Sequence, residues 1–126
     1  MEDLHIQASR STPEINFTAE SGQLLMSGES YPENSFEFYQ PVMVWLKRYL
    51  ARPGCHASLI IQLVYLNTGS TKVMMDILDQ FEDAHLNGRD VRVEWRCEAD
   101  NDRAVETAEE FREEVTLPFT ILELEN

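Results

Sequence analysis

Apolar residues in this chain fall into short runs that alternate between strand spacing and helix spacing. Residues 15–17 and 24–26 are apolar segments around a polar turn, which is typical of a β-hairpin. Residues 57–66 are almost continuously apolar, which predicts a central strand covered on both faces. Residues 91–97 alternate between apolar and polar side chains, so we expect a strand with one face on a core. Residues 119–124 are predicted to form a last strand.

Three segments between these strands have the three- and four-residue spacing of amphipathic helices. Asn34 or Ser35 is expected to cap the first helix. Either its regular part starts near Gln40, or Pro41 lies within its first turns and bends it. The expected buried stripes of the three helices are Phe38, Val42, Trp45, Leu46 and Tyr49; Val73, Met74, Ile77, Leu78 and Phe81; and Val105, Ala108, Phe111 and Val115.

The predicted element order is β-β-α-β-α-β-α-β, which indicates an α/β fold. The later βαβ units favour parallel strands with helices packed on the sheet, and the opening hairpin makes the sheet mixed. We expect residues 1–126 to form a single domain, with residues 1–13 as a loose N-terminal leader.

Composition narrows the possible functions. A formal net charge of −13 argues against nucleic acid or an anionic membrane as a partner, because both need a basic surface. The chain lacks an apolar run long enough to cross a bilayer, and its acidic N-terminus is unlike a secretory signal, so a cytoplasmic protein is expected. The acidity suits protein partners with basic patches, or it simply keeps the protein soluble.

Residues 64–72 carry the strongest chemical signal. Here the apolar run ends in small polar residues, and a predicted helix follows at once. Three hydroxyls, of Thr68, Ser70 and Thr71, therefore lie at a helix N-terminus, where free backbone N–H groups attract negative charge. This junction suits a phosphate, either bound or covalently attached, although the same residues are also ordinary capping chemistry.

Other catalytic or binding chemistries find less support. A nucleotide- or phosphate-binding domain remains an alternative, but the chain lacks the glycine-rich motifs GxxxxGK[ST] and GxGxxG. The adjacent pair Cys55 and His56 leaves an enzyme as a third hypothesis, although free structural thiols are expected for Cys55 and Cys97. Scattered histidines predict no metal site and no cofactor. The glutamates of residues 106–114 are expected to form one solvated helix face.

Three segments resemble the SiaC family of regulatory phosphoproteins, a relative of the STAS domains of anti-sigma-factor antagonists. They are residues 28–34 (GESYPEN), 65–70 (YLNTGS) and 108–113 (AEEFRE). Chain length and element order agree as well. The resemblance implies a STAS-like fold and a phosphoacceptor at Thr68, with Ser70 and Thr71 as further candidates.

The resemblance also implies a non-enzymatic partner switch. A kinase of the anti-sigma-factor type would phosphorylate Thr68, and a metal-dependent Ser/Thr phosphatase would reverse the modification. The unphosphorylated protein would bind and activate a diguanylate cyclase, raising cyclic di-GMP and favouring aggregation or biofilm growth. An anti-sigma-factor antagonist is the alternative within the same class.

Physical reasoning indicates how such a switch would work. A phosphate at a helix N-terminus is favoured by the helix dipole and adds about −1.5 to −2 charge, so it should alter one surface patch without unfolding the domain. A partner docked there would be rejected by the desolvated phosphate. The expected partner-binding residues around Thr68 are Tyr31, Asn67, Gly69, Ser70, Lys72 and Met75.

Overall fold

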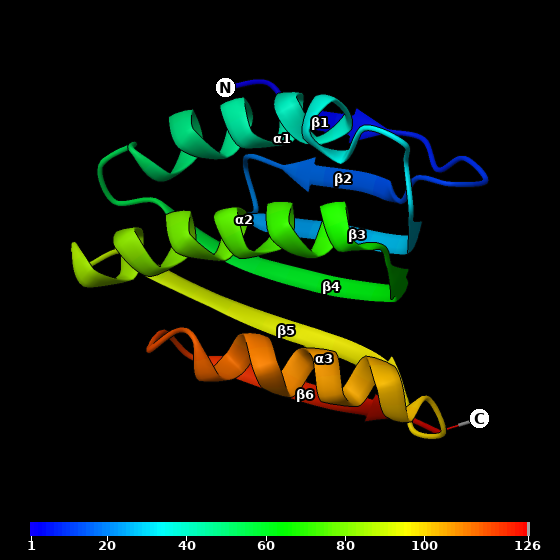
Figure 1. Cartoon of the computed structure of the whole chain (residues 1–126). Helices are drawn as coiled ribbons and strands as arrows, with labels where there is room; N and C mark the ends of the chain where they lie inside the picture. Colours follow the sequence, from blue (N-terminus) through cyan, green and yellow to red (C-terminus); the bar gives the residue numbers. More distant parts are fainter. Residues whose placement is uncertain (126) are drawn as a thin grey trace.

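The computed structural model describes residues 1–125 and places three helices against one six-stranded sheet (Figure 1). The strands are β1 (Leu4–Ile6), β2 (Glu14–Thr18), β3 (Gln23–Ser30), β4 (His56–Leu66), β5 (Asp90–Glu98) and β6 (Phe119–Leu124). The helices are α1 (Ser35–Leu50), α2 (Thr68–Leu86) and α3 (Asp102–Glu113). The predicted mixed α/β fold is confirmed, with one additional strand at the N-terminal end.

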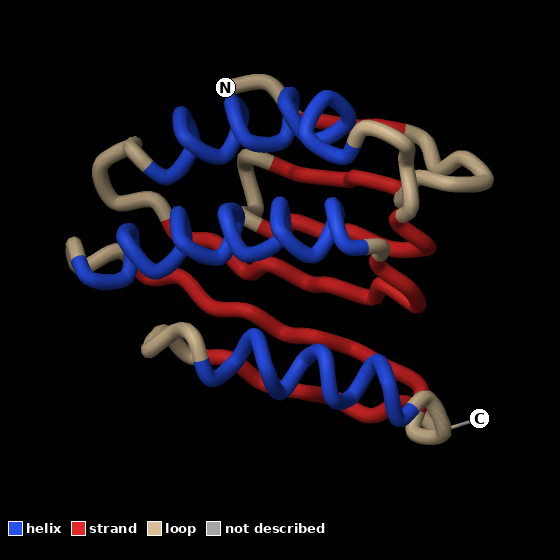
Figure 2. The backbone as a smooth tube through the Cα atoms, viewed as in Figure 1, coloured by secondary structure: helices blue, strands red, loops and turns tan. Residues whose placement is uncertain are grey.

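The spatial order of the strands follows the order of the chain. Strands β1, β2 and β3 are antiparallel neighbours, whereas β3, β4, β5 and β6 pair in parallel. Each helix therefore carries the chain one strand further in the same direction. The βαβ crossovers share the same right-handedness, and each advances across the sheet in the same direction. All three helices therefore lie on the same face of the sheet (Figure 2). Within residues 1–125, the opposite face carries no helix.

This one-sided cover corrects the prediction that the central strand is buried on both faces. Along β4, the side chains of Ala57, Leu59, Ile61 and Leu63 are buried beneath the helices. The alternate residues Ser58, Ile60 and Gln62 are only half-buried, and Val64 is 52% exposed. The prediction failed at Ile60 because an apolar residue on an open sheet face gives the same sequence pattern as a buried core residue. In β5 the alternation holds as predicted.

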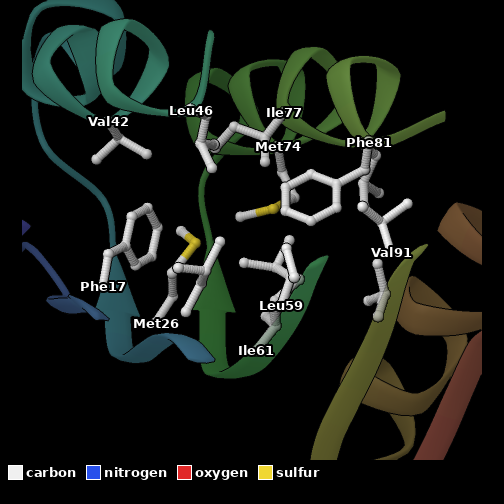
Figure 3. Close-up of a cluster of buried hydrophobic side chains, with 14 of the residues drawn as sticks. Phe17, Met26, Val42, Leu46, Leu59, Ile61, Met74, Ile77, Phe81 and Val91 are labelled. Atoms are coloured by element: carbon white, nitrogen blue, oxygen red, sulfur yellow. The ribbon is translucent and has the colours of Figure 1, made fainter. Parts of the chain in front are cut away.

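The core fills the space between the helices and the covered face of the sheet. Figure 3 shows Leu46 of α1 and Met74, Ile77 and Phe81 of α2 pointing towards strand residues such as Leu59. All five side chains are fully buried, and burying a side chain of this kind contributes about 1.5–3 kcal/mol. The helix stripes predicted from periodicity lie in or against this core, except for Val105, which is only half-buried. In α3 the neighbouring Ala104 is buried instead.

The N-terminal segment is not a loose leader throughout. Leu4–Ile6 forms β1, the edge strand paired with β2. The alternation of Leu4, His5 and Ile6 places two partly buried apolar side chains against the core and leaves the histidine exposed. Two further bonds hold this segment: the Trp45 indole Nε1 donates to the Glu2 carbonyl at 2.8 Å, and the Ala19 amide donates to Asp3 Oδ1 at 2.9 Å.

Helix α1 settles the position of Pro41, since the helix starts at Ser35 and contains the proline. The prediction of a regular helix beginning near Gln40 is therefore wrong. Asn34 provides the N-cap, as expected, because its side chain accepts a hydrogen bond from the Glu37 amide at 3.0 Å. Pro41 lies on the exposed side of the helix, where the ring displaces no core contact.

Candidate functional site

The junction of β4 and α2 is fixed by Asn67, the N-cap of α2. Its side-chain oxygen accepts a hydrogen bond from the Ser70 amide at 2.8 Å, which satisfies one free N–H of the first turn. Its side-chain amide donates to the Pro32 carbonyl at 3.1 Å, and its backbone amide donates to the Ser30 carbonyl at 2.9 Å. The junction is thus tied to the segment that follows β3.

The three hydroxyls of this junction have different environments. Ser70 is fully buried, and its hydroxyl is hydrogen-bonded to those of Ser30 and Ser35. Thr71 is exposed, but its hydroxyl donates back to the Asn67 carbonyl at 3.0 Å. Thr68 is exposed at the first position of α2, and its hydroxyl makes no hydrogen bond within residues 1–125. Of the three, Thr68 offers the most accessible oxygen.

A buried chain of hydroxyl groups lies beneath the junction. The Ser70 and Ser30 oxygens are 2.7 Å apart, Ser30 lies 2.7 Å from the Tyr39 hydroxyl, and Ser35 lies 3.2 Å from Ser70. Burial raises the pKa of Tyr39 to about 12, although the hydrogen bond with Ser30 opposes this shift. These hydrogen-bonded hydroxyl groups come from α1, β3 and α2, so they hold the start of α2 against the rest of the domain.

Gly69 permits the close approach of α1 to this turn. A Cβ atom at this position would lie 2.9 Å from the Ser35 hydroxyl oxygen and 3.2 Å from Ser35 Cβ. Such distances are too short for an undistorted contact, so any larger residue would displace Ser35. The sequence analysis placed this glycine in the expected partner-binding patch. Its packing against Ser35 is a further role, which could not be predicted without knowing where α1 begins.

Exposed aromatic and apolar side chains surround the junction on the β3 and β4 side. Tyr31 and Tyr65 meet edge to face, with ring centroids 6.1 Å apart. Phe36 is 70% exposed, and Val64 is 52% exposed. The parallel pairing of β3 with β4 places Tyr31 beside Tyr65 near the junction, and its role in partner binding stays a prediction.

A groove of about 550 Å³ runs between α2 and α3 on the other side of the junction. Its floor includes Leu63 of β4 and Trp95 of β5. The two strands separate at this point, because their pairing ends at Ile61 and Trp95. Lys72 and Met75 of α2 line it, so two predicted site residues lie here. Thr68, Thr71, Lys72 and Met75 follow i, i+3, i+4, i+7 on α2, so Thr68 lies on the same side of this helix as the three groove residues without lining the groove itself.

The alternative chemistries gain no support from the geometry. Cys55 Sγ donates to the Leu50 carbonyl at 3.6 Å, and within the described chain no hydrogen bond joins it to His56. Burial raises the pKa of the Cys97 thiol, which lowers its reactivity. Residues 1–125 contain no cluster of three or more His, Cys, Asp or Glu side chains placed so that they could hold a metal ion. No helix in that part of the chain is both long and apolar enough to cross a bilayer.

Sequence reasoning missed the buried partners of the site. Ser30, Ser35 and Tyr39 were not assigned to it, because their spacing along the chain gives no sign that their hydroxyls meet. The one available signal was Tyr39 itself, which lies three residues before the predicted core position Val42.

The fold and the site together define a class: a small α/β domain that presents an accessible threonine hydroxyl at a strand-to-helix junction. Comparison with known proteins agrees. Residues 6–124 match the model of the SiaC family regulatory phosphoproteins, and the chain belongs to this family.

The relatives come from Pseudomonas aeruginosa. An uncharacterized protein of strain UCBPP-PA14 is 48% identical over 96% of each chain. The structure of SiaC of P. aeruginosa superposes with a TM-score of 0.92 at 46% identity, covering 98% of this chain and 100% of that one. A crystal structure of the diguanylate cyclase SiaD in complex with its activator SiaC matches with a TM-score of 0.93 at 47% identity, covering 97% and 100%.

Proposed function

We propose that this protein is a non-enzymatic phospho-switch that binds and activates a diguanylate cyclase when Thr68 is unmodified. The observation that carries the proposal is the contrast among the three junction hydroxyls: Thr68 is exposed and unbonded, while Ser70 is buried and Thr71 is bonded to the backbone. The partner follows from family membership and from the relative crystallised as the activator of such a cyclase.

The electrostatics of α2 support reversible modification without unfolding. The first turn of α2 contains no acidic residue, and Lys72 lies one turn beyond Thr68. A phosphate on Thr68 would therefore interact favourably with the helix N-terminus and with Lys72, each by a few tenths of a kcal/mol to about 1 kcal/mol at an exposed site. Most of its effect falls on whatever docks there, because burying an unpaired phosphate is costly.

Two enzymes complete the proposed circuit: a kinase of the anti-sigma-factor type that modifies Thr68, and a metal-dependent Ser/Thr phosphatase that restores the hydroxyl. Neither needs a catalytic group from this chain, which supplies an accessible acceptor in a fixed turn. This cycle belongs in the cytoplasm, where nucleotide substrates for the kinase and the cyclase occur.

The direct test compares unmodified protein with protein carrying phosphate on Thr68, verified by mass spectrometry. We expect the unmodified form and Thr68→Ala to bind a purified diguanylate cyclase and raise its rate of cyclic di-GMP formation, whereas the phosphorylated form does neither. Thr71→Ala serves as the matched control, since it removes a neighbouring hydroxyl and should leave kinase modification intact. Equal activation by modified and unmodified protein would refute the proposal.

A further inference from the structure

The open face of the sheet, opposite the helices, is unusual for strands that run in parallel. Four of the six strands, β3 to β6, are parallel neighbours, and parallel strands are generally covered on both faces. At the centre of this face, Leu25 of β3 lies beside Ile60 of β4, and both are only half-buried. Leu122 of β6 is 43% exposed. The face therefore has an apolar centre that another molecule can cover.

Strand β5 adds a row of alternating charges to the open face. The odd-numbered residues from 91 to 97 are buried and point towards the helices. The residues between them point to the open face, and four of them alternate in sign: Arg92, Glu94, Arg96 and Glu98. Glu94 and Arg96 form an ion pair, yet each side chain remains 36% exposed. A row with this order of signs is complementary to a reversed copy of itself.

We infer that a second copy of this chain covers the open face, so that two sheets stack about a two-fold axis. The axis lies between the sheets, perpendicular to the strands, and crosses β5 midway between Glu94 and Arg96. It places Arg92 opposite the partner's Glu98, and Glu94 opposite the partner's Arg96. Because the symmetry repeats each contact, four pairs of opposite charge form along the row. Asp90, at the start of β5, lies beyond the partner's row.

The size of the face suits a reversible dimer. Six strands about 4.8 Å apart, with about seven residues each at about 3.3 Å per residue, present about 650 Å² of sheet in each copy. The total of about 1,300 Å² is at the low end for specific protein interfaces. Stacked sheets lie about 10 Å apart, a distance that an arginine and a glutamate side chain span together. We therefore expect dimerisation to depend on protein concentration.

This dimer leaves the proposed switch accessible. The helices, and with them Thr68 at the start of α2, lie on the side of the sheet that faces away from the second copy (Figure 2). Each dimer therefore presents two junctions, and each junction can be modified separately. The inference goes beyond the function proposed above and does not depend on it.

Exchange of charges along β5 tests the dimer in the full-length protein. Sedimentation velocity from about 5 µM to about 500 µM at low salt should show wild-type protein passing from monomer to dimer, and about 0.5 M salt should weaken the dimer. An all-acidic row (Arg92→Glu with Arg96→Glu) and an all-basic row (Glu94→Arg with Glu98→Arg) should each weaken self-association by about tenfold or more. An equimolar mixture of these two variants should form a heterodimer.

Two controls separate the order of the charges from their number. A variant that carries all four substitutions keeps both the alternation and the net charge, so it should dimerise like wild-type protein. Lys47→Glu with Arg48→Glu changes the net charge as much as the all-acidic row does, but on the exposed side of α1. This variant should also dimerise almost as wild-type protein does. Circular dichroism establishes that each variant is folded.

Three outcomes would overturn the inference. The first is a wild-type protein that stays monomeric over the whole concentration range. The second is dimerisation of the all-acidic and all-basic variants as strong as that of wild-type protein, which would place the interface elsewhere. The third is a monomeric wild-type protein whose all-acidic and all-basic variants no longer activate the cyclase, which would assign the open face to the cyclase. Activation by monomeric wild-type protein would leave the proposed function standing.

Discussion

At the scale of single residues, the chemistry of the site depends on which hydroxyls are buried. The same short segment contains a serine that stabilises the fold and a threonine that is free to react, and they are only two residues apart. Helix geometry separates them, because positions i and i+2 point in different directions. Ser70 points inward to Ser30 and Ser35, and Thr68 remains outside.

Tyr39 provides a pH-dependent test of the buried hydroxyl chain. Its pKa is about 12 in the folded protein against 10.0 in a model compound, so the folded state holds the phenol proton more tightly than the unfolded state does. The stabilisation is fully present below about pH 10 and is lost as the pH rises towards about 12. At that pH, ionisation of Tyr39 should lower the free energy of unfolding by about 2 kcal/mol.

The measurement is urea denaturation of wild-type protein and Tyr39→Phe from about pH 9 to about pH 12. Other titrating groups contribute equally to both proteins, so the difference between the two slopes isolates Tyr39. Wild-type stability should fall more steeply over this interval, whereas parallel curves would mean that the hydroxyl is not buried as described.

At the scale of the elements, each helix is started by an asparagine. Asn34, Asn67 and Asn101 each accept a hydrogen bond from the backbone amide three residues on, at 3.0, 2.8 and 3.1 Å. Of these, Asn67 also donates its side-chain amide across to the Pro32 carbonyl. It therefore holds the position of the Thr68 turn as well as capping a helix.

This double role predicts different consequences for two otherwise similar substitutions. Asn67→Ala and Asn101→Ala should each lower the free energy of unfolding by about 1–2 kcal/mol, because each removes one N-cap. Only Asn67→Ala should also slow phosphorylation of Thr68, because it releases the turn from the segment after β3. Thermal denaturation and a kinase assay with the purified proteins check the two effects. Equal phosphorylation of both variants would limit Asn67 to capping.

Strand β1 makes a second prediction at this scale. Deleting residues 1–7 removes the pairing with β2, the bond from Trp45 to Glu2 and the burial of Leu4 and Ile6. We expect a loss of about 2–4 kcal/mol in the free energy of unfolding and a tendency to associate through the exposed edge of β2. His5→Ala is the control, since this side chain is exposed and the backbone pairing remains. An unchanged free energy of unfolding after the deletion would support the original prediction that these residues form a loose leader.

At the scale of the whole molecule, local patterns predicted the elements, whereas the layers depended on topology. Alternation in residues 91–97 and the apolar stripe from Val73 to Phe81 sufficed to predict β5 and α2, since each has one face on the core. The open face beside Ile60 was missed because a short apolar run looks the same with one cover or two. The α2–α3 groove was out of reach, because it depends on where β4 and β5 diverge.

Net charge is a property of the whole chain, and it predicts how the protein meets its partner. With a formal charge of −13, the unmodified protein should attract a basic patch on the proposed cyclase partner over a distance set by ionic strength. The association rate should therefore fall as salt is raised from about 0.05 M to about 0.5 M, while the dissociation rate changes much less.

Two charge changes separate this long-range attraction from direct contact beside Thr68. Glu20 is exposed near the start of β4, at the opposite end of the sheet from Thr68. Glu20→Lys should slow association slightly at low salt and leave dissociation unchanged. Lys72→Ala should instead speed dissociation, because Lys72 lies one turn beyond Thr68 in the expected partner-binding patch. Stopped-flow kinetics at the two salt concentrations measure both rates. An association rate independent of salt would show that the acidity serves solubility alone, so that recognition rests on short-range contacts and on the state of Thr68.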